Sequence, residues 1–153
     1  MPKQSAGVLL YRDRGGSVEV LLVHPGGPFW ARKDEGAWSI PKGEFNESED
    51  PLAAARREFE EELGAPASGE FISLGSIKQS GGKRVYAWAL RGEFDAALLR
   101  SNTFKMEWPP KTGREMEFPE VDRAEWFDLT SARKKILKGQ VELIGRLQQI
   151  VAG

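Results

Sequence analysis

Two apolar, β-rich runs open the chain, and a polar turn with two glycines separates them. Residues 5–12 and 18–24 are rich in valine and leucine, side chains that fit strands. Runs of this length on either side of a short glycine-containing segment are typical of β-hairpins. A second pair of runs, residues 71–79 and 84–91, flanks a Ser-Gly-Gly-Lys turn in the same way. The pattern therefore predicts two hairpins, one near the start of the chain and one in its middle.

The region between these hairpins, residues 51–63, has helical periodicity. Apolar side chains recur there every three or four residues, which places them on one face of an α-helix. These side chains are Leu52, Ala55, Phe59 and Leu63. Asp50 can cap the amino end, Pro51 suits the first helical position, and Gly64 suits the end of a helix. We expect a helix that packs one side on a core.

The second half of the chain is less regular. Residues 95–100 favour a short helical turn, and residues 104–121 combine a possible short strand with three prolines and a glycine. Residues 124–128 have a strand pattern, and residues 131–151 have the periodicity of one terminal helix. The apolar set of that helix is Ile136, Leu137, Val141, Ile144, Leu147 and Ile150.

Hairpins combined with two helices predict an α/β fold in which helices cover both faces of a mixed β-sheet, an α/β/α sandwich. Periodicity alone is also compatible with other α+β topologies. The 153 residues, of which 40% are hydrophobic, are enough for one substantial core. We therefore expect residues 1–153 to form a single domain.

The composition narrows the classes of function. Lys and Arg number 22 against 23 Asp and Glu, so the chain lacks the basic excess of a general nucleic-acid binder. Without cysteine it has no disulfide and no thiolate metal site, and its one histidine, His24, excludes a His-rich zinc site. No apolar stretch approaches 18 residues and no secretory signal is visible, so we expect no membrane span and a cytoplasmic location.

Three carboxylates occupy one face at the end of the predicted helix. Glu58, Glu61 and Glu62 are spaced i, i+3 and i+4, in the last turn before Gly64. Each anion there is destabilised by about 0.3 to 1 kcal/mol, because it lies near the negative end of the helix dipole. Like charges at i and i+4 also repel each other. A divalent cation that prefers oxygen ligands, Mg²⁺ or Mn²⁺, reverses both effects. The alternative interpretation is an acidic helix end exposed to water.

The segment from Gly43 to Ala65, GEFNESEDPLAAARREFEEELGA, resembles the Nudix box, G-x5-E-x7-R-E-U-x-E-E-x-G-U, in which U is a bulky aliphatic residue. All glycine and charged positions match. Phe59 occupies the first U position, and Ala65 is smaller than the usual residue at the last one. The resemblance implies the Nudix fold and hydrolysis of a nucleoside diphosphate linked to another moiety, with water attacking phosphorus and metal ions bridging the phosphates.

The resemblance also implies roles for individual residues of the box. The expected metal ligands are Glu58, Glu61 and Glu62. Glu61 or Glu62 would in addition orient the attacking water, and the carbonyl of Gly43 can supply a further ligand. Arg57 is the remaining catalytic candidate, and we expect Glu49 to hold it in place. The identity of the general base stays open among these acids.

Many Nudix enzymes take another carboxylate from outside the box, near the strand before the last helix. Glu120, six residues before Trp126, has a similar placement, and we select it as a further metal ligand. Glu115 and Glu117 are the alternatives. An exposed loop acid without a metal role is an equally good interpretation of Glu120.

A glycine- and proline-rich connection, residues 24–33, leads toward the box and carries candidates for substrate contacts. Together with Lys42, which directly precedes the box, the substrate-binding candidates are Arg32, Lys33 and Trp30. Trp30 or its neighbour Phe29 can stack on a base, and the basic residues can contact phosphates. Both aromatics can instead pin the loop to the core. We expect His24 to make local hydrogen bonds rather than to act as a catalyst.

Markers of substrate specificity are missing from the sequence. Diadenosine polyphosphate hydrolases of the family tend to have a tyrosine, and ADP-ribose enzymes a proline, near the position of residues 80–83, which are Ser-Gly-Gly-Lys here. Nucleoside triphosphates and diadenosine polyphosphates are the leading small-molecule substrates. An inactive nucleotide-binding regulatory module of the same fold is the alternative. A decapping-type activity on RNA ends lacks the support of a basic stripe. The sequence does not indicate an oligomeric state.

Overall fold

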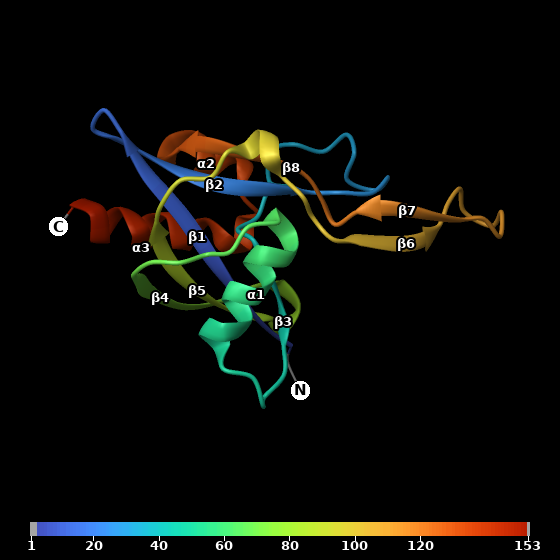
Figure 1. Ribbon diagram of the computed structural model, residues 1–153, viewed down its shortest axis with the longest axis horizontal. Helices are drawn as coiled ribbons and strands as arrows, with labels where there is room; N and C mark the ends of the chain where they lie inside the picture. Colours follow the sequence, from blue (N-terminus) through green and yellow to red (C-terminus); the bar gives the residue numbers. More distant parts are fainter. Residues whose placement is uncertain (1–2, 153) are drawn as a thin grey trace.

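A mixed β-sheet forms the centre of the protein in the computed structural model, which describes residues 3–152 (Figure 1). Its strands are β1 Gln4–Arg14, β2 Ser17–Pro25, β3 Lys42–Phe45, β4 Phe71–Lys78, β5 Arg84–Arg91 and β8 Val121–Asp128. They follow the order β4–β5–β1–β2–β8, and β3 pairs with the first residues of β1. β1 and β5 run parallel, and the other pairs run antiparallel. Both predicted hairpins, β1–β2 and β4–β5, are present.

Helices cover both faces of this sheet. α1 (Pro51–Leu63) packs on one face, and α3 (Val141–Ala152) packs on the other together with α2 (Leu129–Lys135). Successive residues of β1 alternate between the two cores: Val8 belongs to the core under α1, and Leu9 belongs to the core under α3. The central strands therefore read as continuous apolar runs, and the predicted α/β/α arrangement is confirmed. Within residues 3–152, no helix is long and apolar enough to span a membrane.

The ends of α1 are set by the residues that the sequence indicated. The carboxylate of Asp50 accepts a hydrogen bond from the backbone N–H of Ala53 at 3.0 Å, and Pro51 occupies the first turn. Gly64 has a φ of 82°, a left-handed conformation that terminates the helix. The helix therefore begins and ends within a residue of the prediction, which fixes the orientation of its acidic face.

The expectation of one terminal helix over residues 131–151 is wrong, because the chain breaks between α2 and α3. Ile136 has extended backbone angles and forms a parallel bridge with Trp38. The N–H of Leu137 donates to the carbonyl oxygen of Trp38 at 2.7 Å, and Gly139 lies in the 3₁₀ turn that follows. Pairing with a distant backbone segment thus replaces the helical hydrogen bonds at this point.

Residues 104–121, for which only a possible short strand was expected, contain a second sheet of two strands. β6 (Thr103–Glu107) and β7 (Glu115–Pro119) pair antiparallel, with Phe104 opposite Phe118 and Met106 opposite Met116. This hairpin projects well beyond the central sheet (Figure 1). Because three prolines and one glycine interrupt the segment, its alternation of apolar and polar residues was hard to recognise. The expected short helical turn near residue 95 is present as a 3₁₀ turn, Ala96–Leu98.

Candidate active site

Four of the site residues selected from the sequence line one pocket of about 200 Å³. They are Trp30, Lys42, Glu62 and Glu120. The other walls come from the ends of β2 and β8 and from the backbone that enters β3, and they are mostly apolar. These lining residues are Val23, Pro25, Ala37, Ser39, Ile40, Val121 and Leu137. The pocket therefore has a charged end next to α1 and an apolar interior.

Gly43 brings the backbone of β3 against the acidic face of α1. β3 pairs with β1, with Gly43 opposite Ala6, and α1 packs across both strands. A Cβ atom on Gly43 would lie 2.0 Å from Cδ of Glu58 and 2.1 Å from its Oε2. Only glycine leaves room for the carboxylate to approach this closely. A larger residue at the start of the box would therefore displace the Glu58 carboxylate from this position.

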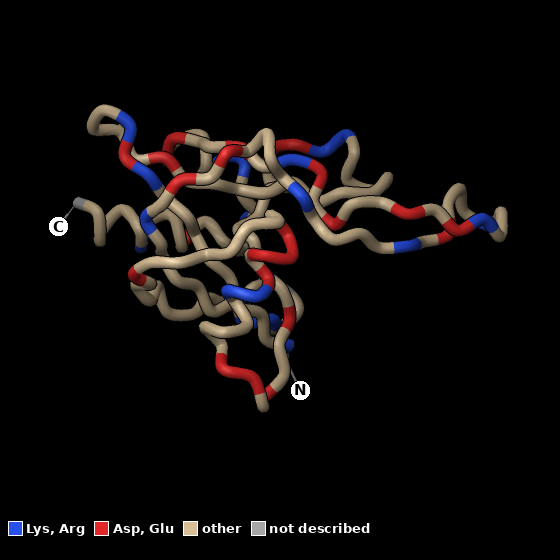
Figure 2. Tube along the Cα trace, viewed as in Figure 1, with Lys and Arg blue, Asp and Glu red and all other residues tan. Residues whose placement is uncertain are grey.

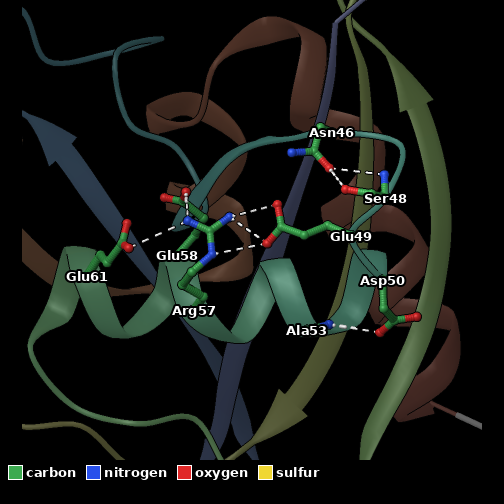
Figure 3. A network of polar contacts seen from close by, with 8 residues as sticks. All are labelled: Asn46, Ser48, Glu49, Asp50, Ala53, Arg57, Glu58 and Glu61. Atoms are coloured by element: carbon green, nitrogen blue, oxygen red, sulfur yellow. Dashed lines mark hydrogen bonds and ion pairs between the residues drawn. The ribbon is translucent and has the colours of Figure 1, made fainter.

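Arg57 contacts the carboxylates of Glu49, Glu58 and Glu61 (Figure 3). Its guanidinium donates to the carboxylate of Glu49, with Nη2 3.0 Å from Oε2, which is the pairing expected from the sequence. Nη1 donates to Oε1 of Glu58 at 3.0 Å and lies 3.5 Å from Oε1 of Glu61. The fork geometry of arginine suits two carboxylates at once. Arg57 thus orients Glu58 and Glu61 without lining the pocket itself.

Negative charge is concentrated at the charged end of the pocket. Burial, followed by the neighbouring charges of Glu58 and Glu120, raises the pKa of Glu62 to about 8, although Lys42 opposes the change. Burial also raises the pKa of Glu58, and the charge of Glu61 acts in the same direction. Burial lowers the pKa of Lys42, against the effect of the Glu62 carboxylate. Arg57 opposes the shift at Glu58 and Lys42 opposes the shift at Glu62, but both pKa values stay raised. A further cation would therefore favour the ionised carboxylates.

The donor set suits a hard divalent cation. Glu58 and Glu62 on α1, and Glu120 in the bend between β7 and β8, offer carboxylate oxygens, which are the ligands that Mg²⁺ and Mn²⁺ prefer. Glu61 lies on the same helix, and its carboxylate is paired with Arg57. In the part of the chain that the structure describes, no three acidic or histidine side chains converge closely enough to hold an ion without rotating. Binding would therefore require Glu58 or Glu61 to turn away from Arg57.

The other substrate candidates lie elsewhere. Arg32 and Lys33 are exposed and border a separate depression together with Arg123 and Lys135. The ammonium of Lys33 lies 5.2 Å from the ring centroid of Trp30. The structure thus joins Trp30 and Lys42 with the acids, and it does not bring the two basic residues of the loop into the same pocket.

Two buried polar residues near the pocket were not assigned a site role from the sequence. His24, expected to make local hydrogen bonds, is fully buried and lies 2.8 Å from the carboxylate of Asp122 through Nδ1. Gln140 is also fully buried; its Oε1 accepts from the N–H of Ile40 at 3.1 Å, and its Nε2 donates to Oγ of Ser39 at 3.0 Å. Because these partners are about 100 residues apart in the chain, no local pattern could reveal them.

Known proteins share both the sequence pattern and the fold. The model of the NUDIX domain matches residues 1–147. The chain is 32% identical over 120 residues to an 8-oxo-(d)GTP phosphatase of Mycolicibacterium smegmatis, over 70% of this chain and 34% of that protein. It is 27% identical over 149 residues to an RNA pyrophosphohydrolase of Bartonella henselae, over 83% of this chain and 76% of that protein. The chain thus spans about a third of the first relative and about three quarters of the second.

Among solved structures, a binary complex of an Ap4A hydrolase from C. elegans superimposes with a TM-score of 0.67. The match covers 99% of this chain and 98% of that one at 22% identity, which establishes the shared fold. The domain match covers nearly the whole chain, and it includes Lys42, Glu62 and Glu120, which line one pocket. On these grounds the chain belongs to the Nudix family.

Proposed function

We propose that this protein hydrolyses a phosphoanhydride bond in a nucleoside diphosphate linked to another moiety, with water as the nucleophile and Mg²⁺ or Mn²⁺ as the cofactor. The leading substrates are nucleoside triphosphates and diadenosine polyphosphates. The observation that carries the proposal is the clustering of Glu58, Glu62 and Glu120. Burial first, and then the charges of Glu58 and Glu120, raise the pKa of Glu62 to about 8. Burying a carboxyl group beside two other acids is unfavourable for folding, so the arrangement indicates a function.

The chain's own residues suggest a division of roles. Glu58, Glu62 and Glu120, with the carbonyl of Gly43, would hold the divalent cation, and Glu61 would join them when it leaves Arg57. When bound, such a cation neutralises phosphate charge and makes a water molecule more acidic. Lys42 lines the same pocket and is placed to contact a phosphate oxygen. The apolar walls and Trp30 offer a surface for a base.

The relatives support the reaction class more strongly than any one substrate. Their names describe a phosphatase acting on 8-oxo-(d)GTP, a pyrophosphohydrolase acting on RNA and a hydrolase acting on Ap4A. All three names describe removal of phosphate groups or cleavage between them, on different nucleotides. We therefore keep the substrate at the level of a nucleotide polyphosphate.

A substrate panel with matched variants tests this proposal. Nucleoside triphosphates, 8-oxo-dGTP, ADP-ribose and diadenosine tetraphosphate should be assayed with Mg²⁺, with Mn²⁺ and with EDTA. We expect turnover that depends on the metal and falls by at least about 100-fold in Glu62→Gln. Glu60→Gln is the matched control, because Glu60 is exposed on the same helix. Reaction of the best substrate in ¹⁸O-labelled water identifies the phosphorus that is attacked.

Two results would contradict the proposal. Failure to hydrolyse any member of the panel with either metal would exclude the activity for this set of substrates. Tight nucleotide binding without phosphate release, unchanged in Glu61→Gln and Glu62→Gln, would instead support the regulatory module.

A further inference from the structure

Ser39 brings a hydroxyl group to the apolar interior of the pocket. Ser39 and Val23 lie directly opposite each other in an antiparallel bridge, so their side chains stand on the same face, and both residues line the pocket. Lys42, at the charged end, follows Ser39 by three residues, so their backbones are at most about 11 Å apart. A single ribose separates the base of a nucleotide from its own phosphates. One nucleotide can therefore place its phosphates at Lys42 and its base at Ser39.

The fully buried side chain of Gln140 contacts Ser39 in one defined orientation. The backbone N–H of Ile40 can only donate, so the amide atom that lies 3.1 Å from it must be the oxygen, Oε1. The amide nitrogen, Nε2, therefore faces Oγ of Ser39 at 3.0 Å, and it also lies 3.4 Å from Oε1 of Gln79. Because an amide nitrogen is a donor, the hydroxyl oxygen of Ser39 must accept this hydrogen bond.

These contacts determine what the Ser39 hydroxyl can offer to a ligand. A serine hydroxyl has one hydrogen to donate and two lone pairs that can accept. Its hydrogen goes to the carbonyl oxygen of Ile40, with Oγ 2.7 Å from that oxygen. One lone pair accepts from Nε2 of Gln140. The second lone pair is left for a ligand, so Ser39 presents an acceptor and keeps its hydrogen within the protein.

The backbone of the apolar walls uses its N–H groups within the protein. Val23 and Ser39 exchange N–H···O bonds of 2.8 and 3.0 Å, and Pro25 has no N–H. The other wall residues donate their N–H groups to carbonyl or side-chain oxygens of the protein: Trp30, Ala37, Ile40, Val121 and Leu137. Among the side chains of these walls, Ser39 and the indole of Trp30 carry the polar atoms. The wall at Ser39 therefore presents an acceptor to a bound base.

An acceptor at this position selects the chemistry of the base. The exocyclic amino group of adenine, cytosine or guanine can donate to Oγ of Ser39. An exocyclic oxygen in the same place, as in uracil, would set two acceptors against each other and leave both without a partner. We propose that Ser39, oriented by Gln140, binds the exocyclic amino group of the substrate base, so that the enzyme prefers amino-bearing nucleotides; this rests on the proposed hydrolase function.

A free nucleotide fits this arrangement better than an RNA chain does. Figure 2 shows Lys and Arg interspersed with Asp and Glu along the trace. With a net charge of −1, the chain lacks the basic excess that would follow an RNA backbone. Recognition then depends on one base and its own phosphates.

The test uses UTP and three pairs of nucleotides in Mg²⁺, the members of each pair differing only by the amino group. The pairs are ATP with purine riboside triphosphate, GTP with ITP, and CTP with zebularine triphosphate. For the pair that contains the best substrate, we expect wild-type kcat/KM to be about tenfold lower for the analogue, mainly through KM, because one neutral hydrogen bond is lost. In Ser39→Ala the two members should differ by less than about twofold.

Two further variants separate this effect from a general structural one. Gln140→Met removes the donor that faces Ser39 and lets the hydroxyl turn, so the preference for the amino-bearing nucleotide should shrink whatever the overall activity. Ser68→Ala changes an exposed serine outside the pocket and should keep the wild-type preference. A purely structural role of Ser39 or Gln140 would change kcat/KM equally for both members of a pair.

The outcomes separate this inference from the proposed function. Hydrolysis with UTP as the best substrate, or a preference that survives in Ser39→Ala, overturns the inference alone. A preference seen only with a 5′-triphosphorylated oligoribonucleotide overturns it in favour of RNA, and an unchanged preference in Gln140→Met overturns the role of Gln140. If the wild type hydrolyses none of these nucleotides, the proposed function fails for them, and calorimetric titration in Mg²⁺ then decides. One amino-bearing nucleotide must bind wild type about tenfold more tightly than its analogue does, and Ser39→Ala must remove this difference; any other result overturns the inference.

Discussion

Glu62 should make the free energy of unfolding of the metal-free protein fall as the pH rises. Burial and the charges of Glu58 and Glu120 raise its pKa from 4.5 to about 8 in the folded protein, and the unfolded chain returns it to the ordinary value. At a pH between these two pKa values, the folded protein keeps a proton on Glu62 that the unfolded chain has lost. The stability associated with the protonated carboxyl is therefore fully present below the unfolded pKa and is lost as the pH rises through the folded pKa.

The magnitude follows from the difference between the two pKa values. A pKa difference of one corresponds to about 1.4 kcal/mol. If the site were rigid, ionisation of Glu62 would therefore lower the free energy of unfolding by on the order of 5 kcal/mol. Because Glu62 lines an open pocket, its carboxylate can turn toward water, which reduces the loss. We therefore expect the free energy of unfolding to fall by about 2 kcal/mol between about pH 5 and pH 8.5.

Urea denaturation in EDTA at several pH values checks this prediction. Glu62→Gln removes the titrating group, so its stability should change much less over the same range, whereas Glu60→Gln should follow the wild type. Some dependence on pH should remain in Glu62→Gln, because burial also raises the pKa of Glu58. Addition of Mg²⁺ at high pH should restore the stability of the wild-type protein, since a bound cation compensates the charge of the ionised carboxylates. Parallel pH profiles of the wild type and Glu62→Gln would refute the reasoning.

Three further substitutions test the site and the fold. Gly43→Ala places a methyl carbon 2.0 Å from Cδ of Glu58, so the Glu58 carboxylate must move. We expect kcat/KM to fall about 100-fold. Activity within twofold of wild type would contradict a role for the position of the Glu58 carboxylate. Leu147→Ala removes a fully buried side chain of α3 and should lower the free energy of unfolding in urea by about 2 to 5 kcal/mol. Gln149→Ala, exposed on the same helix, should change it by less than about 0.5 kcal/mol, and equal effects of the two would count against the assigned core. Asp50→Ala should lower the free energy of unfolding by about 1 kcal/mol, because the amino-terminal cap of α1 is lost, whereas Asp50→Asn should stay close to wild type. A smaller loss in the alanine variant than in the asparagine variant would show that the cap does not stabilise α1.

Elements whose signals are local were predictable from the sequence. Asp50 and Pro51 set the start of α1 within one turn, and Gly64 ends it through its own backbone conformation. Both hairpins of the central sheet have turn residues between strand-forming runs, so their pairing also follows from adjacent residues. The spacing of Arg57 and the glutamates places them on one helix face for the same reason.

Features that depend on distant partners were not predictable. The break before α3 exists because Ile136 pairs with Trp38, 98 residues earlier in the chain. The site shows the same limit. Lys42 and Glu120 line one pocket because β2 pairs with β8 and also bridges to Ser39, just before β3, whereas Arg32 borders another depression. No spacing in the sequence distinguishes these lysine and arginine residues. The expected single domain and cytoplasmic location stay predictions.

We propose that Glu58, Glu62 and Glu120 together bind divalent cations for cleavage of a phosphoanhydride bond. Anomalous diffraction from crystals soaked in Mn²⁺ tests it most directly, because manganese can be located independently of any activity. We expect anomalous density between the carboxylates of Glu58, Glu62 and Glu120, with Glu58 or Glu61 turned away from Arg57. Crystals without such density, in which Arg57 still holds both glutamates and Glu62 lies in solvent, would contradict it.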